Sequence, residues 1–476
     1  MSAARALSLS CWLLIAAAII ACACGLPLVW DGAYQLAVSL VEQKPYFYQT
    51  RFHSWLLWWP CVALSRATGN LTALTFAFGL PFIAAPAASL WLSWRIVRKH
   101  RPELITWAAF GVAIAGLPGQ AFVINDSIWQ QTMFWPVLLG ALVPLSRRGK
   151  LVLGALAIFQ LSHQAGVLLL LVATLAALAT DTPTTGDIHA QLGKFVPLAV
   201  LFLLAAAKAL WIAIPALSGP LHDSYAAQQM SWDELATTYR DGVLGPPLFG
   251  MLAMWFAAFT PFARRRRVRL LGLAAILAAG ALWSWWALEP QRWAGAINYR
   301  RWVVPFALPF MFAAIAATRR SWELPVTLTG GVTVSKAEMQ VAFRLTPPKL
   351  GAERYALAPL ATLVFCAVIM LQSLGWRRLV TRLNAEIASD PRIVVSRDAV
   401  PWIERTPLDH WGATALVALH GGKKPEKYFA FNAGASTALR SGKIWLGDGH
   451  TIPAAPGPAG FFDHRPLLER LAAEKR

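Results

Sequence analysis

Long uninterrupted apolar runs constrain the fold of this chain more than any other feature. They recur through most of the first 376 residues, and most are about twenty residues long, the length that a helix needs to cross the hydrocarbon core of a bilayer. Apolar residues make up 57% of the chain and charged residues 14%, and many basic residues gather in short clusters between the runs. The sequence therefore predicts an all-α polytopic membrane protein.

The basic clusters predict the orientation of the spans. Residues 95–101, 147–150 and 264–269 are expected in the cytoplasm, because short loops on that side carry an excess of Lys and Arg. The run at 151–178 is too long for one ordinary span, and an SHQAG motif interrupts it at 162–166. As a single span it would place the 264–269 cluster outside, so we interpret it as two short spans that meet at an outer turn. Broken helices of this kind are tolerated where they line a cavity.

This interpretation gives about eleven transmembrane helices. They are predicted at 8–28, 71–94, 104–123, 128–145, in two halves of 151–178, at 195–217, at 248–262, in a run ending at 288, at 302–317 and at 357–376.

The predicted spans divide the chain into a multi-span domain, residues 1–376, and an extracytoplasmic domain beyond the last span, residues 377–476. In the second domain, short apolar stretches separated by Gly, Pro and charges predict a small α/β fold. Arg377 and Arg378 follow the last span on the extracytoplasmic side, where arginines next to a span are disfavoured. Long terminal domains, however, translocate largely regardless of charge. We expect a multi-pass protein of the bacterial inner (plasma) membrane with a cytoplasmic N-terminus. The net charge of +19 lies largely in the loop clusters, so we expect a bilayer and not a nucleic acid as partner.

The outer loop at 30–60 mixes acids, bases and aromatic residues more densely than any other loop. Its apolar positions recur at helical spacing and predict two short helices in the interface plane, separated by Pro45. Candidate substrate-binding residues in this loop are Tyr34, Arg51 and His53.

Asp31 opens this loop, directly after the first apolar run. As a candidate catalytic residue it can act as general base toward an acceptor hydroxyl or bind a divalent cation. It can equally cap a helix that starts at Gly32. Asp126, in the INDS turn expected on the same side, is a second candidate catalytic acid, or the cap of the fourth span.

Other polar residues in or beside the spans are candidates for substrate binding. His163 interrupts an apolar run, where a satisfied hydrogen bond explains it as well as a ligand role does. Lys208 lies about two thirds along the span at 195–217, so it either extends its ammonium to the headgroups or binds a phosphate within the bundle. Tyr299, Arg300 and Arg301 precede a late span, where the arginines anchor the interface or bind a pyrophosphate.

Several of these features together resemble the membrane-embedded C-type glycosyltransferase superfamily. They are the WDGAY and PYFY segments of the first outer loop, the INDS turn, the pair of short middle helices, the NYRRWVVPFALPF entry to a late span and the C-terminal extracytoplasmic domain. In that superfamily an acid of the first outer loop acts in catalysis, and the resemblance assigns this role to Asp31. It also relates Tyr299, Arg300 and Arg301 to an Arg-Tyr type motif, here in altered order. Many members have two adjacent acids where this chain has Asp31 and Gly32, so the need for a divalent cation stays open.

The resemblance implies an enzyme that moves a sugar from a polyprenyl-phosphate-linked donor to a glycan, lipid or protein acceptor of the cell envelope. A transporter or flippase of a lipid-linked or anionic substrate is the alternative, with Lys208 and outer arginines as its binding groups. A third reading is a non-catalytic component of an envelope polysaccharide system.

Overall fold

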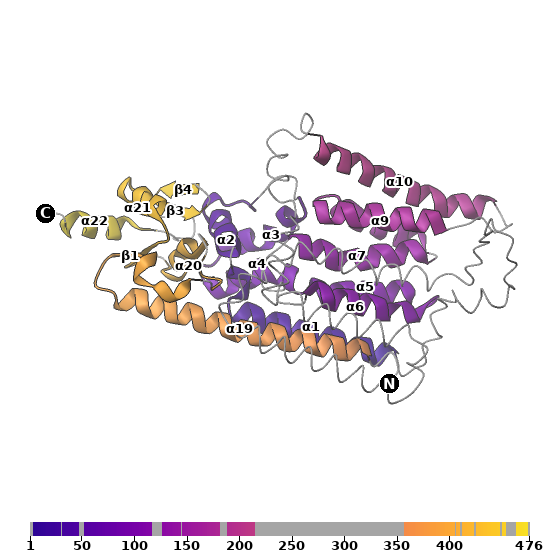
Figure 1. Ribbon diagram of the computed structural model, residues 1–476, viewed down its shortest axis with the longest axis horizontal. Helices are drawn as coiled ribbons and strands as arrows, with labels where there is room; N and C mark the ends of the chain where they lie inside the picture. Colours follow the sequence, from indigo (N-terminus) through magenta and orange to yellow (C-terminus); the bar gives the residue numbers. More distant parts are fainter. Residues whose placement is uncertain are drawn as a thin grey trace, which may run out of the picture.

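The computed structural model describes most of the two ends of the chain (Figure 1). The described residues are 3–29, 31–46, 52–116, 126–143, 145–180, 188–214, 357–404, 406–409, 412–422, 425–447, 450–453 and 463–474. The spans predicted at 248–262, in the run ending at 288 and at 302–317 lie outside these residues.

A bundle of helices forms the larger part of the described structure, and two shorter helices lie at one end of it (Figure 1). The bundle consists of α1 (Ala3–Ala23), α4 (Leu71–Ile83), α5 (Ala85–Val97), α6 (Ile105–Gly116), α7 (Asp126–Leu142), α8 (Arg147–Gln160), α9 (Gln164–Thr180), α10 (Ile188–Ala213) and the first part of α19 (Leu357–Ser389). The shorter helices are α2 (Asp31–Glu42) and α3 (Phe52–Ser65), and two 3-10 turns cover Leu26–Leu28 and Pro102–Leu104.

The C-terminal region combines small pairs of strands with short helices. Its elements are β1 (Val394–Ser396), 3-10 turns at Arg397–Ala399 and Pro401–Ile403, α20 (Gly412–His420), β2 (Tyr428–Ala430), α21 (Ala433–Arg440), β3 (Lys443–Gly447), β4 (His450–Pro453) and α22 (Arg465–Glu474). β1 and β2 pair in parallel, while β3 and β4 pair antiparallel. Tyr428, Phe429 and Ala430 of β2 and the residues from Gly412 to Leu419 of α20 are all buried, which builds a small core.

The described structure is therefore mostly helical with a small sheet region near the C-terminus, as the sequence predicts. Among the described helices, none by itself combines the length and apolarity of a membrane span, whereas α4 and α5 do so together across a bend of 40°. The expectation of about eleven spans stays a prediction.

The span predicted at 71–94 is two helices instead of one. α4 ends at Ile83 and α5 begins at Ala85, with Ala84 between them. Pro81 lies in the last turn of α4 and Pro86 in the first turn of α5. Because proline lacks the N–H that continues a helical ladder, the two prolines account for the break.

α1 and α19 lie side by side and run in the same direction (Figure 1). Trp376 is 1% exposed, and its Nε1–H donates to the carbonyl of Gly25, just beyond the end of α1, at 2.9 Å. Gly25 has a φ of 76°, which glycine adopts without steric cost. This pairing places the start of α1 at the end of the bundle opposite the C-terminal region.

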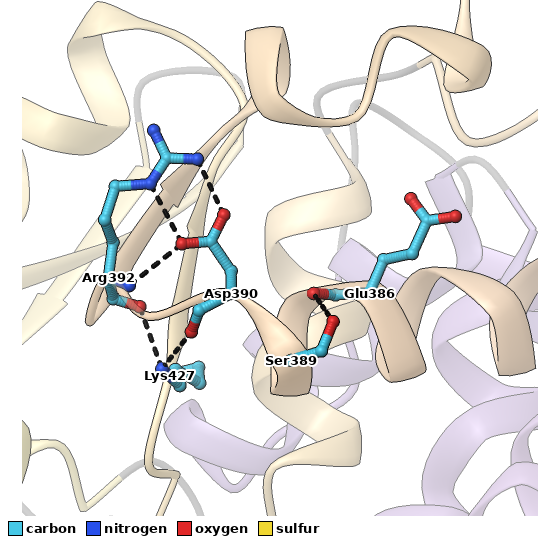
Figure 2. A network of polar contacts seen from close by, with 5 residues as sticks. All are labelled: Glu386, Ser389, Asp390, Arg392 and Lys427. Carbon is cyan, nitrogen blue, oxygen red and sulfur yellow. Dashed lines mark hydrogen bonds and ion pairs between the residues drawn. The ribbon is translucent and has the colours of Figure 1, made fainter.

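α19 continues beyond residue 376, the predicted end of the last span, and carries the chain into the C-terminal region. Its end is fixed by local contacts: Ser389 Oγ donates to the Glu386 carbonyl at 3.0 Å, and Asp390 accepts from the backbone N–H of Arg392 at 2.9 Å (Figure 2). The ammonium of Lys427 donates to the carbonyls of Asp390 and Arg392 at 2.6 and 3.0 Å, which joins this turn to the chain entering β2.

Candidate functional site

Three segments that are far apart in the sequence meet in a buried polar cluster at one end of the bundle. His53 comes from the first turn of α3, Gln130 from the second turn of α7, and Ser162 from the break between α8 and α9. We call these three residues the polar cluster. They are at most 1% exposed. The cluster shows that the start of α7 and the α8–α9 break lie at the same end of the bundle, as the predicted turns require.

The α8–α9 break was expected from the SHQAG motif and is present, since α8 ends at Gln160 and α9 begins at Gln164. The break leaves helix-end carbonyls without intrahelical partners. The carbonyl of Phe159 accepts from the side chain of Ser162 at 2.7 Å and from Nε2 of Gln130 at 2.8 Å. The break thus supplies both the hydroxyl and the carbonyl around which the polar cluster assembles.

Close contacts connect the members of the polar cluster. Ser162 Oγ lies 2.5 Å from Nδ1 of His53, and Gln130 Nε2 donates to Ser162 Oγ at 2.7 Å. Aromatic rings enclose the imidazole: Trp129 stacks on His53 with ring centroids 5.1 Å apart, and Phe159 meets Trp129 edge-on at 6.2 Å. A hydrogen-bonded imidazole in such a dry setting is held in one orientation.

The segments that form the polar cluster carry further buried amide side chains, which were not among the predicted site residues. Gln131 and Gln160 are also at most 1% exposed, and their side-chain amides have no hydrogen-bond partner within the described part of the chain. Buried amides of this kind are uncommon and call for a partner. The signal in the sequence was the polar IWQQT segment that follows INDS at the start of an apolar run.

His163, predicted as a substrate-binding residue, has a local structural role. Its Nδ1 accepts from the backbone N–H of Ala165 at 3.1 Å in the first turn of α9. This contact satisfies one of the N–H groups that a helix start leaves unpaired. The sequence left two explanations for His163, a satisfied hydrogen bond or a role as a ligand. This contact is a hydrogen bond of the first kind.

Asp31 and Tyr34 lie on α2, which packs against α20 and β3 of the C-terminal region. Asp31 is the first residue of α2, in the first turn, where the helix dipole favours a carboxylate. Every residue from Gly32 to Leu40 is buried, and the Tyr34 ring meets Tyr46 edge-on at 5.4 Å.

The burial of α2 differs from the expected interface helix. Small residues such as Gly32, Ala33 and Ala37 allow close approach on more than one face, so protein covers this helix. α3 keeps an exposed apolar face instead, with Phe52, Trp55 and Leu56 between 37% and 50% exposed. The two predicted helices exist, but only α3 presents apolar side chains outward in this way.

Lys208 lies on α10, which packs against α9. Its ammonium is placed over the ring of Trp211, 3.8 Å from the centroid, a cation–π contact. α9 and α10 lie side by side (Figure 1).

The remaining predicted site residues have no described side chain. Asp126 begins α7, so it lies one turn before Gln130, but its side chain is outside the description. Arg51, Tyr299, Arg300 and Arg301 lie outside the described residues. Their assignments stay predictions.

The opposite end of the bundle is basic. The start of α1 and the end of α5 lie there, away from the C-terminal region (Figure 1). α8 begins there too, because only residues 143–146 separate it from the end of α7. Exposed basic residues at these positions are Arg5, Arg95, Arg98, Lys99, Arg147, Arg148 and Lys150.

No three His, Cys, Asp or Glu side chains of the described residues are grouped closely enough to hold a metal ion. No family model, curated protein or solved structure matches this chain. The resemblance to C-type glycosyltransferases therefore rests on the sequence motifs given above.

Proposed function

We propose that this chain is a multi-pass glycosyltransferase of the bacterial inner membrane. It moves a sugar from a polyprenyl-phosphate-linked donor to a glycan, lipid or protein acceptor on the extracytoplasmic face. The observation that carries the proposal is the convergence of α3, α7 and the α8–α9 break in one polar cluster, at the end of the bundle where α2, which begins at Asp31, packs against the C-terminal region. Of the segments that carry the family resemblance, the start of α7 after INDS and the pair of short middle helices, α8 and α9, are thereby neighbours in space.

The proposed orientation uses the two unlike ends of the bundle. Short cytoplasmic loops carry an excess of Lys and Arg, so the basic end is assigned to the cytoplasm, and the polar cluster and the C-terminal region to the outside. A lipid-linked donor has its phosphate at headgroup depth, and the acceptor reaches it from the extracytoplasmic side. About eleven spans, including the bent α4–α5 pair, complete this topology.

The proposed chemistry needs a carboxylate and cationic groups. Asp31 accepts the proton of the acceptor hydroxyl as a general base, or holds a divalent cation that neutralises the leaving phosphate. A general base must lie within about 3 Å of the hydroxyl that it deprotonates. Asp126, at the start of α7, is the competing acid.

The decisive experiment replaces Asp31 with Asn. Asn keeps the size of the side chain and its favourable oxygen in the first turn but removes the charge. If Asp31 is the general base, transfer from a radiolabelled polyprenyl-phosphate monosaccharide by the full-length chain in proteoliposomes should fall by about 10²- to 10⁴-fold.

Glu42→Gln is the matched control, because Glu42 is the exposed carboxylate at the other end of α2 and pairs with Lys44 at 3.2 Å. This variant should keep its activity. Full activity of Asp31→Asn would contradict the catalytic assignment. Loss of activity together with loss of folded protein would assign Asp31 a structural role only.

The topology has its own test. Reporter fusions at Gly69 and at Arg476 should both report the extracytoplasmic side. A cytoplasmic signal at Arg476 would contradict the proposed number of spans.

A lipid or anion transporter is the second candidate, favoured by the interrupted helices α4–α5 and α8–α9, because transporters form their binding sites from discontinuous helices. Lys208 would bind the phosphate in either case. Lys208→Met should then weaken donor binding without lowering stability in detergent, and unchanged affinity would leave Lys208 as an anchor over Trp211. Movement of a fluorescent polyprenyl phosphate between leaflets without sugar transfer would favour the transporter.

A further inference from the structure

A proline lies in the interior of α7, the helix that carries Gln130 into the polar cluster. Pro136 has no backbone N–H, so the carbonyl of Thr132, four residues earlier, lacks the helical donor that this position would supply. The ring of a proline inside a helix also crowds the carbonyl four residues before it. Thr132 is buried, and a buried carbonyl that loses its helical donor needs another partner.

That partner comes from a neighbouring helix. α5 and α7 lie side by side, and the hydroxyl of Ser89 on α5 donates to the carbonyl oxygen of Thr132 at 2.6 Å (Figure 1). Ser89 is itself fully buried. A carbonyl oxygen only accepts, so the single hydroxyl proton of Ser89 is directed toward it. The hydrogen bond from α5 therefore replaces the one that Pro136 removes from α7.

Different neighbours hold α7 at the proline and toward its start. The buried ring of Trp135 lies against Gly111 of α6 so closely that a Cβ atom added to Gly111 would be 1.9 Å from its Cζ2. Nearer the start of α7, Nε2 of Gln130 donates to the carbonyl of Phe159 at 2.8 Å and to Ser162 Oγ at 2.7 Å. The direction of α7 between these two points thus determines whether Gln130 reaches the α8–α9 break.

A small change of direction at the proline is enough to undo these contacts. Gln130 lies six residues before Pro136, which is about 9 Å along the axis of a helix. A change of about 10° at Pro136 would therefore move Gln130 by about 1.5 Å. That shift exceeds the difference between a hydrogen bond of 2.8 Å and the separation of about 3.5 Å at which the bond is lost.

We infer that Ser89 is a positioning residue: by binding the carbonyl that Pro136 leaves without its donor, it fixes the direction of α7 and so holds Gln130 on the α8–α9 break. Helices in a bilayer tolerate an internal proline where a serine of a neighbouring helix binds the freed carbonyl. The inference goes beyond the proposed function and does not depend on it, because it concerns how the polar cluster is held, whichever ligand the protein handles.

A double-mutant cycle tests whether Ser89 acts through Pro136, using reversible unfolding of the full-length protein by SDS in mixed micelles. Ser89→Ala leaves the Thr132 carbonyl buried without this donor and should raise the unfolding equilibrium constant by about 5- to 150-fold. Pro136→Ala restores the backbone N–H, so in that background the effect of Ser89→Ala should be at least about 5-fold smaller. An effect of the same size in both backgrounds would overturn the inference.

Ser93 supplies the matched control. It lies one turn further along α5 and is fully buried, and its hydroxyl has no hydrogen-bond partner within the described part of the chain. Ser93→Ala deprives no acceptor of its donor, so it should leave the unfolding equilibrium constant unchanged or lower it. If Ser89→Ala alone does not fold, folding of the double variant Ser89→Ala/Pro136→Ala supports the inference. Failure of the double variant beside a folded Pro136→Ala overturns it.

The position of Gln130 is measured through His53, whose Nδ1 lies 3.5 Å from Gln130 Nε2 and 2.5 Å from Ser162 Oγ. The readout is ¹⁵N NMR of histidine-labelled, full-length protein in detergent micelles, where the signals of His53 are identified by their loss in His53→Asn. They should shift in Ser89→Ala, because Gln130 moves, and stay in place in Ser93→Ala. Unchanged His53 signals in a folded Ser89→Ala would overturn the positioning role.

Discussion

Gly166 offers a sharp test of how the α8–α9 break is packed. It is buried in the first turn of α9, and a Cβ atom added there would lie 2.2 Å from the carbonyl oxygen of Gln160 and 2.9 Å from its Oε1. Since favourable contacts need about 3.5 Å, the backbone of the break must open by about 1 Å in Gly166→Ala. A backbone carbonyl cannot move aside as a flexible side chain can.

The expected magnitude follows from two opposing terms. Overpacking costs about 1–3 kcal/mol, and replacing Gly by Ala within a helix returns up to about 1 kcal/mol. Gly166→Ala should therefore destabilise the protein by about 1–2 kcal/mol. Gly154 in α8 is the matched control, because an added Cβ meets nothing within 4 Å, so Gly154→Ala should be stabilising by about 0.5–1 kcal/mol.

The assay is reversible unfolding of the full-length chain in mixed micelles, followed by far-UV circular dichroism as SDS is added. A local readout accompanies it: the ¹⁵N signals of His53 should shift in Gly166→Ala, because Ser162 lies in the same break, and should stay unchanged in Gly154→Ala. Equal stability of the two variants, with unchanged His53 signals in both, would refute the packing described for this break.

Three further predictions concern other parts of the fold. Trp376→Phe removes the hydrogen bond to Gly25 and should lower the free energy of unfolding by about 1–3 kcal/mol in the same micelle titration. Asn70→Ala removes the side-chain cap of α4 and should cost about 0.5–2 kcal/mol, measured in the same way. The hydrogen bonds from Arg392 lower the pKa of Asp390 to about 2. This depressed pKa means that the contact stabilises the folded state above pH about 4 and is lost as the pH falls toward 2, so a carboxyl ¹³C titration of Asp390 should have its midpoint near 2 and return toward about 4 in Arg392→Ala.

The sequence by itself determined the local elements of this protein. Apolar periodicity located α2 and α3, the SHQAG motif located the break between α8 and α9, and the alternation of short apolar stretches with Gly and Pro indicated an α/β region near the C-terminus. Each of these signals arises within a few residues of chain, because helix and turn preferences are local.

The sequence was less informative about limits and breaks of helices. The prolines at 81 and 86 were visible, but an apolar run of this length also suits one continuous span. The end of the last apolar run suggested a boundary at 376, whereas α19 continues to Ser389 because polar residues such as Arg382 and Glu386 support a helix outside an apolar environment as well.

Only the tertiary structure decided which polar residues act together. His53 and Ser162 are 109 positions apart, and nothing local selects that pairing over the neighbouring His163, which caps its own helix. In the same way, periodicity showed that α2 has an apolar face but not that α20 covers it, since the partner of a buried face is fixed by long-range packing. Local preferences set which stretches form helices, and the burial of polar groups against distant partners set which polar residues form a site.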